Sequence, residues 1–331
     1  MNIIKYFVAT VISITSIMSP INAAAAGPNN PGSGGNGLRI SPVKSSVTVN
    51  PGSSRIVNIS VTNVTTEPAV IQGVVNDFYA KKDESGSPAV ILDPQAYSSS
   101  HSLKRFAKPL GKYSLNPGQT ITVPVEINIP ANAAGGGYFG AARFYPAAVA
   151  STPKSNVSLL SSVGSLILVK VPGDLKELMN LKSFTVAQDG EVGTFFTSNK
   201  NLSSVIRIEN KGNVHEQPFG KLVVRDRSGK IVFEKEINNQ ASPNSVLPDS
   251  TRKFNIPIDN IKTVGKYKVE GAFGYGASGQ LLTGTTSFYY IPKIVIIGAI
   301  ILIALILFLI FGLPKVIRTY NKRVVRNARR R

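Results

Sequence analysis

The chain has 331 residues, with 37 lysines and arginines against 18 acidic residues, and it contains no cysteine. The absence of cysteine excludes disulfide bonds, thiol catalysis and thiolate metal sites. Only two histidines are present, His101 and His215, which leaves little material for acid–base or zinc chemistry. We therefore expect a chain that is not an enzyme and that uses no cofactor or metal.

The N-terminus has the organisation of a secretory signal. Lys5 supplies a positive charge, residues 6–18 are mostly apolar, and residues 23–26 are four alanines that offer small-residue cleavage sites. The alternative is a retained N-terminal membrane helix, but the apolar stretch is short and interrupted by threonines and serines. We predict a signal peptide over residues 1–26, followed by a flexible, glycine-rich linker over 27–37.

Alternating apolar residues start directly after this linker. Val57, Ile59 and Val61 alternate with polar residues, and residues 121–129 do the same, which is typical of half-buried strands. Pro124 interrupts the second of these strands, so we expect it at a sheet edge or facing solvent.

The same tripeptide precedes both strands. Asn50-Pro51-Gly52 and Asn116-Pro117-Gly118 suit type II turns, because proline presets the first φ angle and glycine allows the positive second one. A closing strand over 164–171 completes a first domain, predicted over residues 38–173. The intervening segments 81–94 and 98–112 are polar and indicate loops, with a helical turn around 101–106.

A second domain, predicted over residues 174–290, has the same style. The apolar segments 222–224 and 231–233 flank the hairpin signal Asp226-Arg227-Ser228-Gly229, and residues 267–275 form another alternating strand. Strands at this spacing without a long helical pattern favour an immunoglobulin-like sandwich in each domain. The predicted fold class is therefore all-β, with two immunoglobulin-like β-sandwich domains followed by a single transmembrane α-helix.

The C-terminal region indicates a membrane anchor. Residues 294–313 carry no charge and are long enough to span a bilayer, and we predict the transmembrane helix over 291–314. The segment 315–331 has no acidic residue, so we expect a basic cytoplasmic tail that fixes a single-pass orientation with both domains outside the cell. The orienting residues are Lys315, Arg318, Lys322, Arg323, Arg326, Arg329, Arg330 and Arg331.

The outer part of the chain is also basic. Of the 37 basic residues, eight lie in the tail and one in the signal peptide, so 28 remain against all 18 acidic residues. A basic surface outside the cell attracts anionic polymers or surfaces, and the predicted topology excludes nucleic acid as its partner. A merely soluble, lysine-rich surface is an equally good interpretation.

Three short motifs have a familiar spacing but the wrong context. Residues 135–140 and 274–279 match the glycine pattern of dinucleotide sites, yet neither lies between a strand and a helix. We interpret the first as a loop entering a strand and the second as a hairpin turn. His215-Glu216 lacks the second histidine of a zinc protease motif, so we expect a histidine in a solvated turn.

Residues 138–145 contain the strongest candidate for a binding surface. On a strand, Phe139, Arg143 and Tyr145 share one face, and two aromatic rings beside an arginine suit sugar rings or a peptide partner. The alternative is that both faces of this strand are packed. We predict Phe139, Arg143 and Tyr145 as binding residues.

The order of these parts resembles the WxL-interacting proteins of Gram-positive cell walls. The resemblance rests on Leu-Arg-Ile-Ser-Pro at 38–42, on Asn-Pro-Gly before a strand ending at Asn63, on residues 129–140, and on the closing strand that ends at Pro172-Gly173. It implies that the first domain is a peptidoglycan-binding domain and that the second, with Glu-Asn-Lys-Gly-Asn at 209–213, takes the place of their host-binding domain. The chain has no tryptophan, so it is not itself a WxL-type ligand.

The favoured function is a non-catalytic, membrane-anchored cell-surface protein that binds peptidoglycan, an anionic wall polymer or a surface protein. The alternative is an adhesin or surface-assembly scaffold that recognises a protein partner by sheet-edge pairing. An enzyme acting on wall polymer is a third hypothesis, although the sequence offers no recognisable catalytic site for it.

Overall fold

The computed structural model describes residues 37–147 and 162–328. The predicted signal peptide and all but the last residue of the predicted linker lie outside the described residues, as do Arg329, Arg330 and Arg331. The range Gly32–Arg331 belongs to one unit of contacting elements.

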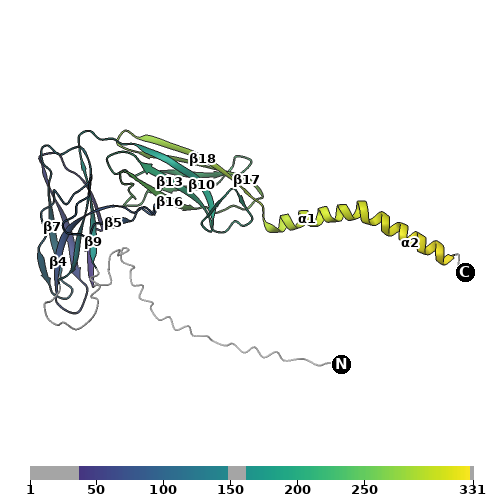
Figure 1. The fold of residues 1–331 in the computed structure, drawn as a ribbon, viewed down its shortest axis with the longest axis horizontal. Coiled ribbons are helices and arrows are strands. Elements are labelled where there is room, and N and C mark those ends of the chain that lie inside the picture. Colours follow the sequence, from purple (N-terminus) through teal and green to yellow (C-terminus); the bar gives the residue numbers. More distant parts are fainter. Residues whose placement is uncertain (1–36, 148–161, 329–331) are drawn as a thin grey trace, which may run out of the picture. The chain divides into compact units, whose positions relative to one another are not determined.

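The first nine strands form an immunoglobulin-like sandwich, drawn from purple to teal in Figure 1. One sheet has the order β1-β3-β7, and the other has the order β2-β9-β8-β4-β5, with β6 also paired to β4. The strands are β1 (Leu38–Ser41), β2 (Lys44–Thr48), β3 (Ser54–Asn63), β4 (Ala69–Ala80), β5 (Pro88–Val90), β6 (Lys112–Leu115), β7 (Thr120–Asn128), β8 (Gly136–Pro146) and β9 (Val163–Val171).

The alternation in the sequence places the core of this sandwich. Ile59 and Val61 of β3 and Val123 and Val125 of β7 are fully buried, and they pack against Ile167 and Phe144 of the facing sheet. Burying side chains of this size contributes about 1.5–3 kcal/mol each. The alternating strands predicted around 57–61 and 121–129 are therefore confirmed.

The predicted Asn-Pro-Gly turns are confirmed as well. Gly52 and Gly118 have φ angles of 76° and 72°, and the N–H of the following residue donates to the carbonyl of the turn asparagine in both cases. Pro124 lies on β7, an edge strand of its sheet, where a missing N–H costs no ladder bond.

The second sandwich consists of the sheets β11-β10-β13-β16 and β12-β18-β17-β14-β15. Tyr267, Val269 and Phe273 line the buried face of β17, and Phe288 stacks on Tyr267 with ring centroids 5.3 Å apart. The strands are β10 (Met179–Gln188), β11 (Glu191–Gly193), β12 (Phe195–Phe196), β13 (Leu202–Asn210), β14 (Phe219–Arg225), β15 (Ile231–Ile237), β16 (Ser250–Pro257), β17 (Gly265–Tyr275) and β18 (Gln280–Tyr290). The hairpin predicted at 226–229 joins β14 to β15, with Gly229 at a φ of 84°.

The predicted loops are partly wrong. The segment 81–94 contains β5, a strand of three residues. Its strand conformation depends on pairing with Phe78, Tyr79 and Ala80, because its own sequence shows no alternating pattern. The helical turn expected around 101–106 is present, because the N–H of Ala107 donates to the carbonyl of Leu103. This turn contributes to one wall of the site described below.

The C-terminal helix runs further than the sequence predicts. It begins with α1 (Lys293–Leu307), widens into the π-helical turn η1 (Phe308–Gly312) and continues as α2 (Leu313–Ala328), drawn in yellow in Figure 1. Pro314 does not end it, because the wider turn relieves the clash of the proline ring with the preceding turn. The N–H of Leu313 donates to the carbonyl of Phe308, five residues earlier. Among the described residues, one helix, Lys293–Lys322, is long and apolar enough to cross a membrane.

Candidate functional site

An interruption in the sheet edge of β4 marks the candidate site. Along one side β4 pairs continuously with β8, whereas along the other β6 pairs with residues 69–72 and β5 with residues 78–80. The N–H of Gly73 donates to Gly111, and the carbonyl of Asp77 accepts from Ile91, both at 2.9 Å. Odd-numbered residues of β4 therefore direct their backbone groups to this side. The N–H and C=O of Val75 point into the gap, where the described residues supply no backbone partner.

A cavity of about 650 Å³ opens at this gap, and we call it the β4-edge groove. Its walls come from β4, from β8 and from the connection between β5 and β6. This connection leaves the edge of β4 after Ile91 and returns to it at Gly111. The residues on which its chemistry depends are Asn76, Leu92, Tyr97, Arg105, Arg143 and Tyr145.

A buried carboxylate holds one wall of the groove in place. Asp77 is fully buried, and its two oxygens accept 2.8 Å hydrogen bonds from the N–H groups of Ser98 and Lys104. The neighbouring Asn76 donates to the carbonyl of Ile91 at 2.8 Å. Because buried carboxylates need such partners, these bonds fix the segment that carries Tyr97 and Arg105 against β4.

Arg143 lies at the groove without a counter-ion. Its guanidinium donates to the side chains of Asn76 at 3.0 Å and Ser162 at 2.9 Å, both neutral acceptors. Burial lowers the pKa of Arg143, yet a guanidinium stays protonated at neutral pH. No ion pair within 4 Å joins it to a carboxylate in the described part of the chain, and that part contains all 18 acidic residues.

The other cations that line the groove differ in how far partners within the chain already occupy them. The ammonium of Lys108 pairs with Glu126 at 2.8 Å, and Lys104 donates to the carbonyls of Pro94 and Ala96. The ammonium of Lys104 and the guanidinium of Arg105 also lie 4.4 and 5.3 Å from the ring centroid of Tyr97. Arg143 and Arg105 thus supply positive charge beside exposed aromatic and apolar surface.

Of the three predicted binding residues, the groove brings together two. Arg143 and Tyr145 both line it, whereas Phe139 is only 2% exposed and does not reach the surface. The ring of Phe139 packs against Phe78 and both histidines, with centroids 6.0, 5.5 and 5.7 Å away. The outer face of β8 is covered at Phe139 by the second sandwich and by the segment at His101, which no alternation pattern reveals.

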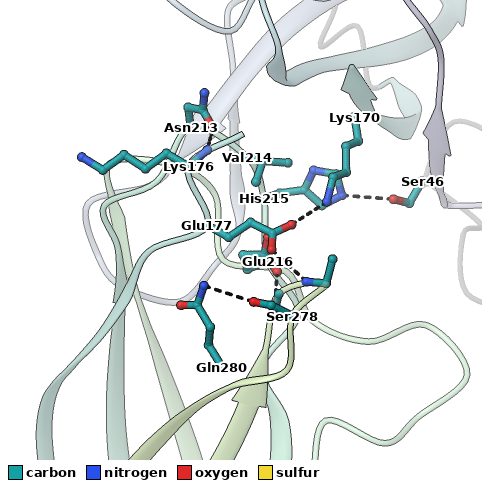
Figure 2. A network of polar contacts seen from close by, with 12 residues as sticks. Ser46, Lys170, Lys176, Glu177, Asn213, Val214, His215, Glu216, Ser278 and Gln280 are labelled. Carbon is teal, nitrogen blue, oxygen red and sulfur yellow. Dashed lines mark hydrogen bonds and ion pairs between the residues drawn. The ribbon is translucent and has the colours of Figure 1, made fainter. Parts of the chain in front are cut away.

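His215 is buried, so the prediction of a solvated turn is wrong. It is 9% exposed, and its Nε2 lies 3.1 Å from the hydroxyl of Ser46 on β2 of the first sandwich. Figure 2 shows this contact between the imidazole and Ser46 as a dashed line. Burial first, and then the charges of Lys170 and Lys44, lower the pKa of His215 to about 4. The imidazole is therefore neutral at neutral pH, and it joins the two sandwiches through packing and one hydrogen bond.

A carboxylate pair continues this junction. Glu177 pairs with Lys170 at 2.7 Å, as Figure 2 shows, and it accepts the N–H of Ala277 at 2.8 Å. Glu216 accepts the N–H of Gly276 at 3.1 Å. The hydrogen bond from Lys170 lowers the pKa of Glu177, whereas burial and the charge of Glu177 raise that of Glu216. These groups tie the end of β9 to the β17–β18 hairpin, which is a structural role.

The remaining motifs have the structural roles that the sequence predicts. Residues 135–140 enter and run along β8, and Gly276 and Gly279 form the turn between β17 and β18 with φ angles of 70° and 68°. Neither lies before a helix. In the described part of the chain, no group of three or more histidine, aspartate or glutamate side chains is placed to hold a metal ion.

Three residues of β4 that shape the groove, Val75, Asn76 and Asp77, were not predicted from the sequence. Asn76 and Asp77 interrupt a mostly apolar strand, and a polar pair at that position is a signal of a buried hydrogen-bonding role. Val75 offers only backbone groups, which no side-chain pattern can reveal. Their function depends on where β5 and β6 end.

Comparison with known proteins gives only distant likenesses. No family model matches the sequence, and no curated protein matches it. Among solved structures, the class 5 fimbriae chaperone CfaA has a TM-score of 0.37 and 14% identity, covering 75% of this chain and 98% of that one. A chain of the CFA/I chaperone–tip adhesin complex has a TM-score of 0.36, with the same identity and coverage.

A chain of the CsuC–CsuE chaperone–tip adhesion subunit complex of Acinetobacter baumannii has a TM-score of 0.33 and 13% identity, covering 77% of this chain and 99% of that one. Likenesses at these TM-scores assign no function to this chain.

Proposed function

We propose that this protein is a non-catalytic, membrane-anchored cell-surface protein that binds an anionic ligand in the β4-edge groove. The ligand belongs to the cell surface, as a wall polymer or as part of a surface protein. The observation that carries this proposal is the position of Arg143, a half-buried cation at the groove whose hydrogen-bond partners in the described part of the chain are neutral.

A half-buried guanidinium is costly without an opposite charge nearby. Removing an ion from water is repaid when an anion and its hydrogen bonds replace the lost hydration. The described residues, which include all 18 aspartates and glutamates, do not supply that anion, since none of these carboxylates pairs with Arg143. A planar guanidinium is also well suited to carboxylate and phosphate groups, which accept two parallel hydrogen bonds.

The C-terminal helix provides the anchor in this proposal. The apolar helix Lys293–Lys322 follows the second sandwich after Tyr290, and Lys315, Arg318 and Lys322 come at its far end. By the positive-inside rule this end stays in the cytoplasm and both sandwiches face outward. The resemblance to WxL-interacting proteins supports the same arrangement, in which the first sandwich binds the wall.

Retention on cell walls tests this function. The full-length protein in detergent micelles is mixed with crude Gram-positive walls that keep their anionic polymers and attached proteins. We expect retention at low salt, weakening as salt screens the charges. The Arg143→Gln variant should lose retention about tenfold, because it lacks the cation that pairs with the ligand. A tenfold loss corresponds to about 1.4 kcal/mol of binding free energy.

Arg55→Gln is the matched control, because Arg55 is exposed on β3 in the opposite sheet and the substitution removes the same charge. Equal retention of the two variants, or no retention of the wild-type protein at low salt, would overturn the proposal.

A further inference from the structure

The gap in the edge of β4 has the dimensions of a short strand. The two flanking hydrogen bonds involve Gly73 and Asp77, which span about 13 Å of extended chain. Between them, Val75 offers one donor and one acceptor on the same side. In an antiparallel pair, one residue of the incoming chain satisfies both groups. The groove lies at these backbone groups and has room for a strand's side chains.

We propose that the occupant of the β4-edge groove is an extended acidic peptide segment of a partner protein, which adds a short strand beside Val75. This proposal rests on the proposed function and names its ligand. The peptide residue opposite Val75 is apolar, and its neighbours on the other face are acidic, with one carboxylate directed at Arg143.

The side-chain pattern follows from the register. Val75 directs its side chain inward, so the residue opposite it also points inward, toward the cavity wall at Ala107 and Leu110. The flanking peptide residues point outward, on the same face as Val74 and Asn76 of β4 and Arg143 of β8. Two strand spacings separate the peptide from β8, about 10 Å, which the side chains of glutamate and arginine bridge together.

A peptide fits these groups better than a polyol phosphate or glycan chain. Both kinds of ligand supply an anion for Arg143. A peptide also presents an N–H and a C=O from a single residue, in the spacing that Val75 requires, and alternating side chains for the two faces. Leu92, Tyr97 and Tyr145 add apolar and aromatic contact for the stems of the outward side chains.

Four fluorescent peptides test the pairing with the full-length protein in detergent micelles. The probe is a capped nonapeptide that alternates valine and glutamate, and a lysine–valine peptide reverses its charge. Two further peptides are the acidic probe with N-methyl groups on its valine amides or on its glutamate amides. Because valines lie opposite Val75, their amides face β4, whereas the glutamate amides face away.

The measured quantity is the dissociation constant by fluorescence anisotropy. We expect the acidic probe to bind, the lysine probe not to bind, and methylation of valine amides to weaken binding at least tenfold more than methylation of glutamate amides. Arg143→Gln and Leu92→Asp should each weaken binding about tenfold, while Arg55→Gln leaves it unchanged. Leu92 is 64% exposed, so its substitution leaves the core intact.

The outcomes separate this inference from the proposed function. Equal binding of the two methylated peptides would contradict the added strand but not the anionic-ligand groove. Binding of polyglycerol phosphate that depends on Arg143, without binding of the acidic peptide, would have the same meaning. If neither probe binds and retention on walls is also independent of Arg143, both proposals fall.

Discussion

The imidazole of His215 meets the ring of Phe139 edge-on, with centroids 5.7 Å apart and planes at 80°, although the two residues belong to different sandwiches. His101 approaches the same ring at 5.5 Å. Phe139 is therefore the point at which β8, the segment at His101 and the loop after β13 pack together. This arrangement makes the junction between the sandwiches a packed hydrophobic contact.

The first prediction concerns this ring. Replacing Phe139 with alanine should lower the free energy of unfolding by about 3–5 kcal/mol, because it leaves a cavity among buried rings. Phe219→Ala is the control, since Phe219 is 59% exposed and its loss should cost far less. Denaturant unfolding of the full-length protein in micelles measures both, and equal losses would show that Phe139 carries no junction packing.

Acid should weaken the fold through His215. Its pKa is about 4 in the folded state against 6.5 for an unperturbed histidine, so between these values protons bind the unfolded chain preferentially. The stabilising effect of the neutral imidazole is therefore complete above about pH 6.5 and is lost as the pH falls to 4, by about 3 kcal/mol.

Glu216 acts in the opposite direction, because burial raises its pKa and its protonation in acid favours the folded state. His215→Gln removes only the histidine contribution. Denaturant unfolding at pH 7, 5.5 and 4 should show that the free energy of unfolding falls more steeply with acid for the wild-type protein than for this variant. Parallel pH profiles would contradict the assignment.

A buried asparagine should be intolerant of a carboxylate. The amide of Asn210 donates to the carbonyls of Val214 and Val246 at 2.7 and 2.9 Å, at the end of β13. Asn210→Asp replaces these donors with an acceptor that faces two carbonyls, and should cost about 1–3 kcal/mol. Asn58→Asp, at an exposed position of β3, should be nearly neutral. Thermal unfolding compares the two, and a neutral Asn210→Asp would show that the amide bonds contribute little.

The absence of cysteine makes the proposed topology directly measurable. Thr285→Cys and Asn321→Cys place single thiols at exposed positions on β18 and on α2. A membrane-impermeant maleimide should label the first in intact cells and the second only after lysis, because the basic end of the helix stays in the cytoplasm. Labelling of Asn321→Cys in intact cells would reverse the orientation.

Local patterns predicted the parts of the fold that local physics determines. The alternation around Ile59 and Val125 indicated which faces are buried, and the Asn-Pro-Gly turns followed from backbone preferences alone. The burial of Phe139 and His215 could not be predicted, because an outward face of one sandwich gives no signal of being covered by another. The continuation of the C-terminal helix through Pro314 was not predicted either, since the adjustment that accommodates the proline lies in the preceding turn.

The candidate site was predictable only in part. The residues 138–145 correctly indicated that Arg143 and Tyr145 share a face, and both line the groove. The groove itself exists because β5 and β6 stop short of each other along β4, and the lengths of such short strands depend on long-range pairing. No periodicity in the sequence encodes the backbone groups of Val75, which have no backbone partner among the described residues.

Hydrogen–deuterium exchange locates the bound ligand most directly. The full-length protein in micelles is compared with and without soluble fragments of crude walls that keep their attached proteins. We expect slower exchange in residues 73–77 and 104–110 of the wild-type protein, and no slowing at these segments in the Arg143→Gln variant. Protection confined to the second sandwich, or the same protection of 73–77 in the Arg143 variant, would contradict a ligand site at the β4-edge groove.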